Sequence, residues 1–213
     1  MSLRAKIVKR ILAIQFSGWT EGSVEEQRAW QEKRNKFSRL PAGVSCKDVS
    51  ANGVPAEWIV GPDAELGILI YLHGGAYALG SIDIHRELIA RLAKSTKTLV
   101  LAINYRLAPE HPYPAALEDA ITTYQWLIDQ GKDPNKIIIA GDSAGGGLAL
   151  ATLIALRDAG KALPAGAVCI SPWTDLALTG ASIEENAQND PILDPNSLRT
   201  YATLYAGDHD TRT

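Results

Sequence analysis

One serine stands in a sequence that could make it a nucleophile, Gly141-Asp142-Ser143-Ala144-Gly145. Before it, residues 136–140 form a short, mostly β-branched run of the kind found in buried strands. After it, residues 144–159 are rich in Ala and Leu and predict a helix. Glycine two residues away on each side permits a sharp strand-to-helix turn, which would expose the hydroxyl. The arrangement predicts attack of the Ser143 Oγ on a carbonyl carbon.

A second glycine-containing segment, His73-Gly74-Gly75-Ala76-Tyr77, directly follows the apolar run 68–72. Backbone N–H groups beside glycines can point into a cavity with no side chain in the way. When an acyl carbonyl is attacked, its oxygen becomes an oxyanion, and donors fixed in place stabilise it. We expect the N–H groups of Gly74, Gly75 and Ala144 to form this oxyanion hole. The His-Gly-Gly motif alone is a weak signal and the Gly-x-Ser-x-Gly motif a moderate one, but both at strand ends and in this order make a strong signal.

Nucleotide binding explains these glycines less well. A dinucleotide fingerprint requires Gly-x-Gly-x-x-Gly, and Ser143 occupies the place of the second glycine. A phosphate-binding loop requires Gly-Lys-Ser or Gly-Lys-Thr, whereas Gly147 and Leu148 follow Gly146. No metal-ligand cluster or cofactor motif is recognisable in the sequence, so we expect neither a cofactor nor a metal.

The elements that must position these residues follow a regular alternation. Strands are expected at 68–72, 98–103, 136–140 and 167–170, with helices at 83–97, 115–130 and 144–159. This order predicts an α/β fold with a mostly parallel sheet and helices on both faces. Two earlier strand-like runs, 44–50 and 55–60, are joined by Ala51-Asn52-Gly53, which predicts a hairpin.

Both ends of the chain have a different character. Residues 1–40 predict helices, namely an amphipathic one through Leu3, Ile7, Val8, Ile11 and Leu12 and another at 24–37. This region carries a net charge of +5 (nine Lys and Arg, four Asp and Glu), which indicates either a solvated helical face or contact with an acidic partner or membrane surface.

Residues 177–190 look like a loop. Asp194-Pro195 predicts a helix start, with Leu198, Tyr201, Ala202 and Tyr205 on one face, and nothing after Ser171 predicts a strand.

The composition of the chain argues against a nucleic-acid-binding protein and against a membrane-spanning one. The 213 residues have a net charge of −3, which gives no general attraction to nucleic acid. No run approaches the roughly 18 apolar residues of a membrane span, and the basic N-terminus lacks the continuous apolar core of a signal peptide. The two cysteines, Cys46 and Cys169, lie in strand-like runs and are expected to be small buried hydrophobic residues in a reducing compartment. We therefore expect a cytoplasmic protein.

Four segments together resemble one family, the hormone-sensitive-lipase-like esterases of the α/β-hydrolase fold, also called bacterial family IV. They are His73–Tyr77, Asn104–Ala116, Gly141–Gly147 and Ser171–Leu176, and they occur in the order and spacing of the family. The resemblance implies a helical cap formed by 1–42 and by part of 177–213, and a core at 43–176. It also implies hydrolysis of carboxylic esters with short or medium acyl chains.

The same resemblance raises a question about the catalytic triad. In this fold the order is serine, then an acid, then histidine, and the family places the last two after further strands. Of the four histidines, His73 and His111 lie within family motifs, His85 opens a helix, and His209 is near the end of the sequence. Asp142 and Asp175 are expected to have structural roles. We therefore expect the triad acid, the triad histidine and the last strands to be absent from this chain.

Two functions remain open at this point. The first is a serine carboxylesterase that acts on a small-molecule ester through an acyl-enzyme, with weak or no activity in these 213 residues. The second is a ligand-binding pseudoenzyme of the same fold.

Without further strands, the strand at 167–170 would form an open sheet edge, so we also expect a homo-oligomer, a swapped dimer or aggregation.

Overall fold

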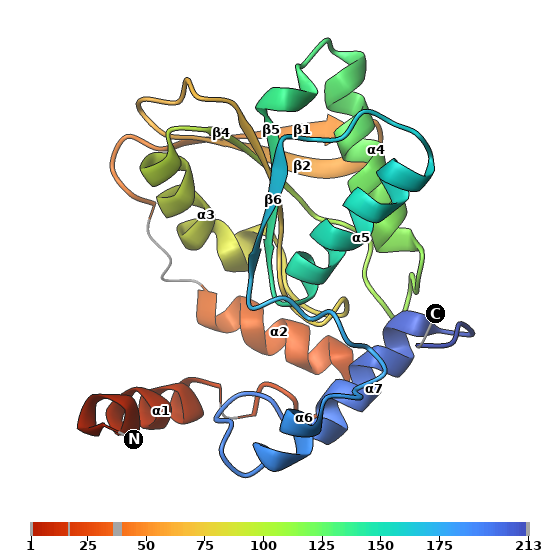
Figure 1. Cartoon of the computed structure of the whole chain (residues 1–213). Helices are drawn as coiled ribbons and strands as arrows, with labels where there is room; N and C mark the ends of the chain where they lie inside the picture. Colours follow the sequence, from red (N-terminus) through yellow and green to blue (C-terminus); the bar gives the residue numbers. More distant parts are fainter. Residues whose placement is uncertain (1, 17, 36–39, 212–213) are drawn as a thin grey trace.

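A twisted sheet forms the centre of the molecule in the computed structural model, which describes residues 2–16, 18–35 and 40–211 (Figure 1). Within these residues the sheet has six strands in the order β1-β2-β4-β3-β5-β6. They are β1 (Ser45–Ala51), β2 (Val54–Val60), β3 (Ile68–Leu72), β4 (Leu99–Ile103), β5 (Ile137–Asp142) and β6 (Gly166–Ile170). Strands β3 to β6 run parallel to one another and β1 and β2 are antiparallel, as predicted.

Helices cover both faces of the sheet. The helices are α1 (Leu3–Gln15), α2 (Val24–Asn35), α3 (Ile82–Thr96), α4 (Ala115–Asp129), α5 (Ala144–Asp158), α6 (Ala181–Glu185) and α7 (Pro195–Ala206), and a short 3₁₀ turn, η1, spans Pro134–Lys136. Helix α3 packs on one face, and α4 and α5 pack on the other (Figure 1). This arrangement confirms the predicted α/β architecture.

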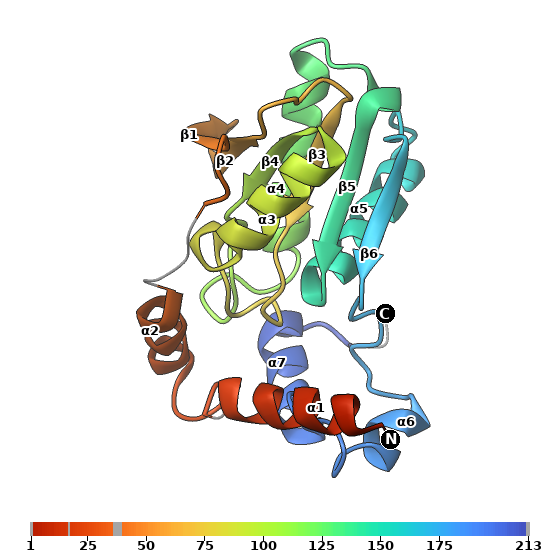
Figure 2. The same cartoon turned by 90° about the vertical axis from the view of Figure 1, so that its left-hand side faces the viewer.

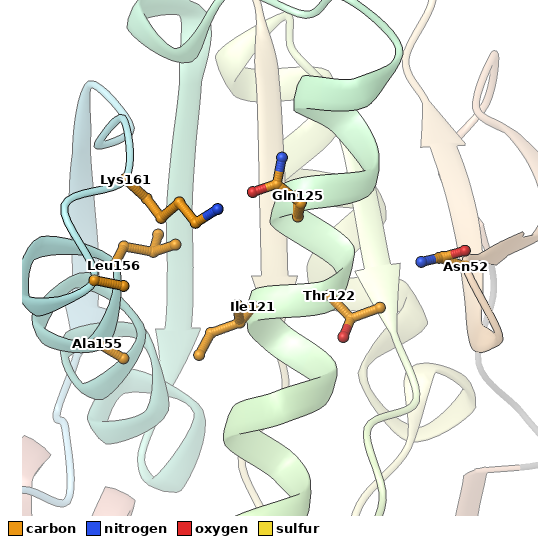
Figure 3. Close-up of a pocket in the computed structure, with 8 residues that line it drawn as sticks. Asn52, Ile121, Thr122, Gln125, Ala155, Leu156 and Lys161 are labelled. Carbon is orange, nitrogen blue, oxygen red and sulfur yellow. The ribbon is translucent and has the colours of Figure 1, made fainter.

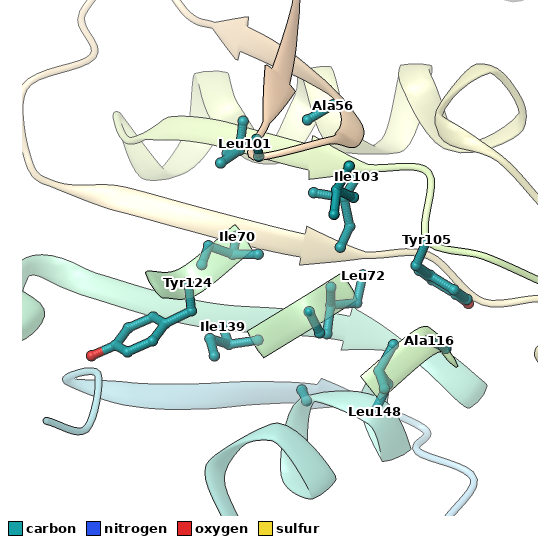
Figure 4. Packing of buried hydrophobic residues seen from close by; sticks show 14 of the residues in the cluster. Ala56, Ile70, Leu72, Leu101, Ile103, Tyr105, Ala116, Tyr124, Ile139 and Leu148 are labelled. Atoms are coloured by element: carbon teal, nitrogen blue, oxygen red, sulfur yellow. The ribbon is translucent and has the colours of Figure 1, made fainter. Parts of the chain in front are cut away.

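The core explains why the central strands are apolar along their whole length. Every residue of β3 is buried, because helices cover it on both sides. On the face that α4 and α5 cover, Ile70, Leu101 and Ile139 belong to one buried cluster with Tyr124, whose ring lies beside Ile70 and Ile139 (Figure 4). The Tyr124 hydroxyl donates a hydrogen bond to the Ala162 carbonyl at 2.8 Å, which satisfies the one polar atom of that side chain.

The hairpin forms where the sequence predicts it. Ala51 pairs with Val54 across the turn, and the two turn residues, Asn52 and Gly53, have φ values of 55° and 99°. Positive φ at both positions is the geometry that favours Asn-Gly in two-residue hairpins. The boundaries of the other predicted elements agree with the structure to within one or two residues.

Three details differ from the sequence-based expectations. Residues 181–185 form α6, although the polar composition of 177–190 predicted a loop. Cys46 is exposed and Cys169 is only half-buried, so the prediction of two buried thiols was wrong. The reason is that β1 and β6 are the outer strands of the sheet, with a neighbour on one side only. The helix predicted at 24–37 is described as far as Asn35, and its last two predicted residues lie outside the described part of the chain.

Four helices, α1, α2, α6 and α7, gather at the carboxyl ends of the parallel strands (Figures 1 and 2). We call them the end helices. Side chains from opposite ends of the sequence join them: the Tyr201 hydroxyl donates to Gln27 Oε1 at 2.6 Å, and the Trp19 ring stacks on Tyr201. The predicted start of α7 is confirmed, because Asp194 caps it by accepting hydrogen bonds from the Asn196 and Ser197 N–H groups.

We predict that Leu101→Ala lowers the free energy of unfolding by about 2–5 kcal/mol, because Leu101 is fully buried between strands and helices and the truncation leaves a cavity. The matched control is Leu66→Ala, because Leu66 is 69% exposed. That change should shift the free energy by no more than about 0.5 kcal/mol. Urea denaturation of both variants measures the difference, and equal effects would contradict the packing described above.

Candidate active site

Ser143 lies at the turn between β5 and α5, in a backbone conformation that few non-glycine residues adopt, with φ 50° and ψ −121°. The turn is tight enough to require glycine beside it. A Cβ atom at Gly145 would lie 2.0 Å from the Leu72 carbonyl oxygen, and one at Gly141 would lie 2.4 Å from the Gly145 backbone. The predicted strand-to-helix turn therefore forms, with glycine at the two positions that need it.

The neighbouring strand holds this turn in place. The Ser143 N–H donates to the Ile170 carbonyl at the end of β6 at 2.9 Å, and the Trp173 N–H donates to the Ser143 carbonyl at 2.9 Å. The backbone of Ser143 is thus fixed on both sides by the segment that leaves the outer strand. Strain in the turn is offset by these contacts and not by the Ser143 side chain.

The loop after β3 approaches the same end of the sheet. It turns tightly on Gly75, whose carbonyl accepts the N–H groups of Ala78 at 3.0 Å and Leu79 at 2.7 Å. Gly75, Ala76 and Tyr77 all have positive φ values. Among the described residues, the N–H groups of Gly75 and Ala76 have no hydrogen-bond partner, and neither has that of Ala144, the first residue of α5.

Gly74 differs from the expectation for the oxyanion hole. Its N–H donates to the Asp142 Oδ1 at 2.9 Å, so this donor is already occupied. The physical reason is that Asp142, at the end of β5, lies beside the end of β3, where Gly74 follows. Among the described residues, the N–H groups of Gly75, Ala76 and Ala144 have no such partner.

Asp142 links several elements, as its predicted structural role implies. Its Oδ1 also accepts the Tyr71 hydroxyl at 2.7 Å, and its Oδ2 lies 3.6 Å from the His85 Nε2. Burial by itself would raise the pKa of Asp142, but the nearby His85 ring and the hydrogen bonds from Tyr71 and Gly74 bring that pKa below its ordinary value. The carboxylate is therefore charged at neutral pH while it holds the loop against β5.

His73 is a structural histidine, in agreement with the sequence-based expectation. Its ring is buried, stacks on Tyr105 at a centroid distance of 4.3 Å, and bonds through Nδ1 to the Gly74 carbonyl. Burial, together with the adjacent His85, lowers the pKa of His73 to about 3, so the ring is neutral at physiological pH. A neutral imidazole donates its Nδ1 proton to the carbonyl and so anchors the loop.

The end helices hold the loop from outside. Arg28 of α2 donates to the carbonyls of Ala78 and Ala108, both at 2.8 Å, and forms a two-pronged ion pair with Glu110. From α7, the Tyr205 ring stacks on Tyr77 at 3.7 Å. Sequence analysis missed Arg28, since an arginine in a polar helix gives no signal of a contact some 50 to 80 residues away.

The remaining candidates for acid and base lie elsewhere. The His209 ring packs edge-on against Tyr113 at 5.1 Å, and Asp175 accepts hydrogen bonds from Thr179 and the Gly180 N–H within its own turn. Within the described ranges, no hydrogen bond joins the Ser143 hydroxyl to a histidine. The structure thus brings together the serine and backbone donors, but no base.

A pocket of about 300 Å³ lies away from this site (Figure 3). Its walls come mainly from α4 and α5, and include Ile121, Gln125, Ala155 and Lys161. Ser143 starts α5 and Ala155 is near its end, which places them about 18 Å apart along the helix axis. This pocket therefore has no part in the chemistry of Ser143.

Known proteins resemble the chain in both sequence and structure. A family described as having the alpha/beta hydrolase fold matches residues 69–213. An acetyl-hydrolase of Streptomyces hygroscopicus is 47% identical over 193 residues, which cover 90% of this chain and 64% of the relative. An esterase of Acinetobacter venetianus is 38% identical over 165 residues, covering 78% of this chain and 54% of that protein.

Solved structures agree with this result. The crystal structure of an esterase from the bacterial hormone-sensitive lipase family superimposes with a TM-score of 0.92 and 37% identity, over 100% of this chain and 72% of that one. The chain belongs to the hormone-sensitive-lipase family of α/β-hydrolases. A crystal of the esterase EstE5 soaked with p-nitrophenyl butyrate matches with a TM-score of 0.90 and 37% identity, over 100% of this chain and 72% of that one.

The chain spans only part of the length of these relatives. It spans 64% and 57% of the length of two of the curated relatives that it matches, the acetyl-hydrolase above and a putative acetyl-hydrolase of Mycobacterium tuberculosis. In the described part of the chain, no helix is long and apolar enough to cross a membrane. The same residues contain no cluster of three or more metal-ligating side chains.

Asp142 gives a testable prediction for this member of the family. In Asp142→Ala, the Gly74 N–H and the Tyr71 hydroxyl lose their acceptor, which should lower the free energy of unfolding by about 1–3 kcal/mol. Asp142→Asn keeps an acceptor and should lose less. Because the pKa of Asp142 is lower in the folded state, its contribution is complete above about pH 4 and is lost as the pH falls through the folded pKa.

Denaturation at a series of pH values measures both effects. The matched control is Asp158→Asn, in which an exposed carboxylate at the end of α5 loses its charge, and its stability should change by no more than about 0.5 kcal/mol at neutral pH. If Asp142→Asn kept the same decline in stability at acid pH as the wild type, Asp142 would not be the group responsible.

Proposed function

We propose that the protein is a serine carboxylesterase with Ser143 as its nucleophile. The observation that carries the proposal is the backbone of Ser143, held at φ 50° between β5 and α5 at the carboxyl ends of the parallel strands. Strained non-glycine conformations persist where the surroundings maintain them, and they cluster at functional sites. The names of the relatives, acetyl-hydrolase and esterase, support the same reaction class.

In the proposed reaction, the Ser143 Oγ attacks the ester carbonyl carbon while its proton passes to a base. The carbonyl π electrons move to oxygen, and the resulting oxyanion accepts hydrogen bonds from the free N–H groups of Gly75, Ala76 and Ala144. Collapse of this intermediate expels the alcohol, which takes the proton, and leaves an acyl-enzyme. Water then attacks the acyl carbonyl and releases the acid and Ser143.

We propose that the base is a histidine other than the four in this chain. His111 is exposed in the turn before α4. His73 is buried and bonded to the Gly74 carbonyl, His85 faces Asp142, and His209 packs on Tyr113. The triad acid is likewise proposed to lie outside these 213 residues, since Asp142 and Asp175 are both committed to structural hydrogen bonds. Activity of the isolated chain is therefore expected to be weak.

The end helices are proposed to be the cap that selects substrates, with residues 1–42 and part of 177–213 enclosing the site above the 43–176 core. They lie at the carboxyl ends of the strands, where ligands of parallel sheets bind (Figure 2). We propose short and medium acyl chains as substrates. The butyrate ester soaked into EstE5 is a direct choice of probe for this range.

A serine-reactive phosphonate tests the nucleophile without requiring the full triad. We predict that it labels the wild-type chain slowly at Ser143 and that Ser143→Ala abolishes labelling, as read by intact mass and peptide mapping. The control is Ser182→Ala, an exposed serine in α6, which should label like the wild type. Labelling that persists in Ser143→Ala would exclude Ser143 as the reactive serine.

Hydrolysis of p-nitrophenyl acetate and butyrate separates the esterase from the pseudoenzyme. Enzymes that lack a triad member retain about 10³–10⁴-fold catalysis over water, so low turnover that depends on Ser143 supports the esterase. Among the described contacts of Ser143 there is no base. This observation supports the second candidate, a ligand-binding pseudoenzyme. Ester binding without any turnover or labelling at Ser143 would favour it.

The open edge of β6 leads to a prediction about assembly. Val168 and Ile170 are 50% and 41% exposed on this outer strand, and unpaired apolar edges recruit further strands. We propose that the isolated chain forms homo-oligomers through β6. Val168→Lys should reduce the apparent mass in light scattering towards that of a monomer, whereas Ile154→Lys, at an equally exposed position on α5, should not. A wild-type chain that stays monomeric at every concentration would contradict this proposal.

A further inference from the structure

Helix α1 carries an apolar stripe that the rest of the described chain leaves exposed. Leu3, Ile7 and Ile11 follow one another at four-residue intervals and therefore lie on one face of the helix. Their exposed fractions are 74%, 52% and 55%, and Val8 nearby is 54% exposed. Large apolar side chains scattered singly over a surface are ordinary, but a contiguous exposed row on one helix marks an interaction surface.

The stripe belongs to a helix that is connected to the body of the molecule. The half-buried residues of α1 include Ala5 and Leu12, which lie on a face away from the stripe. Just beyond the helix, the Trp19 ring stacks on Tyr201 of α7, and its Nε1 donates to the Ile192 carbonyl at 2.9 Å. Helix α1 is therefore held near its carboxyl end to α7 and to the segment before α7, at the outer margin of the molecule (Figure 2).

The charges on α1 are all of one sign. The helix contains Arg4, Lys6, Lys9 and Arg10, and the first acidic residue of the sequence is Glu21. At 100° per residue, Arg4 lies on one side of the Leu3–Ile11 row and Arg10 on the other, with Lys6 beyond Arg10. An apolar row bordered by cations matches a surface that is apolar inside and anionic outside.

We propose that α1 is a docking surface for an anionic phospholipid bilayer. The helix lies in the plane of the surface, with Leu3, Ile7 and Ile11 inserted below the headgroups. Arg4, Lys6 and Arg10 reach the phosphates, whereas Lys9 lies on the opposite, half-buried face with Ala5 and Leu12. Its 13 residues extend about 20 Å, which suits a helix lying on the surface and is too short for one that spans the membrane. A second copy of α1 fits less well, because the three cations that border the row would face the same three cations of the copy.

Sedimentation of the full 213-residue chain with lipid vesicles tests the proposal without any readout of hydrolysis, so its result is independent of the proposed function. Vesicles of equal parts phosphatidylglycerol and phosphatidylcholine should bind the protein, and binding should weaken as salt screens the charges. Vesicles of phosphatidylcholine alone should bind it much more weakly.

Two pairs of variants test the two components separately. Ile7→Ser combined with Ile11→Ser should weaken binding by at least about tenfold, because two side chains no longer insert. The control is Ile154→Ser, at an equally exposed apolar position on α5, which should bind as the wild type does. Lys6→Gln combined with Arg10→Gln should weaken binding roughly 10- to 30-fold, at about 1 kcal/mol per charge.

The control for charge is Lys132→Gln combined with Lys161→Gln, which removes two exposed cations outside α1. Circular dichroism and thermal unfolding check that every variant is folded, which the exposure of all the changed side chains favours. The proposal is overturned if anionic vesicles bind no protein, or if the control pairs lose as much binding as the α1 pairs. It is also overturned if light scattering without lipid shows oligomers that the Ile7 and Ile11 changes disperse.

Discussion

The carboxylate of Asp142 is the interaction on which the rest of the site depends. It accepts a hydroxyl from β3 and the N–H of Gly74, and it faces His85 of α3, so one side chain joins the end of β5 to two other elements. Because Asp142 immediately precedes Ser143, the backbone that carries Ser143 also fixes the position of the glycine loop. A carboxylate at this position offers two acceptor oxygens, and Oδ1 alone accepts from both the Tyr71 hydroxyl and the Gly74 N–H.

Much of this arrangement could be predicted from sequence because it is local. The β-branched run before Gly141 and the Ala- and Leu-rich run after it determine the turn at Ser143, and Asn52-Gly53 determines the hairpin. What could not be predicted depends on contacts between distant segments. Nothing in the sequence near Gly74 shows that its N–H is occupied, because the acceptor is 68 residues away. The exposure of Cys46 likewise depends on strand order, since an outer strand has the same composition as a half-buried one.

The histidines illustrate both what the local sequence predicts and what it does not. Motif context correctly indicated that His73 supports the loop, and the structure adds the reason, which is a neutral ring stacked on Tyr105 and bonded to the Gly74 carbonyl. For His209, the sequence offered only its position near an aspartate. Its contact with Tyr113 forms through the packing of α7, and a pattern of single residues does not encode such packing.

Arg28 gives the N-terminal helices a structural role in addition to the proposed cap. Its guanidinium donates hydrogen bonds to the Ala78 carbonyl, the Ala108 carbonyl and Glu110. Helix α2 therefore holds two loops of the sheet domain in place together. A segment that is proposed to enclose the substrate, and that also supports the loop beside Ser143, cannot diverge freely for one purpose alone. In chimaeras between relatives, exchanging this segment would therefore alter substrate choice and loop geometry together, unless Arg28 and its three partners were exchanged as a unit.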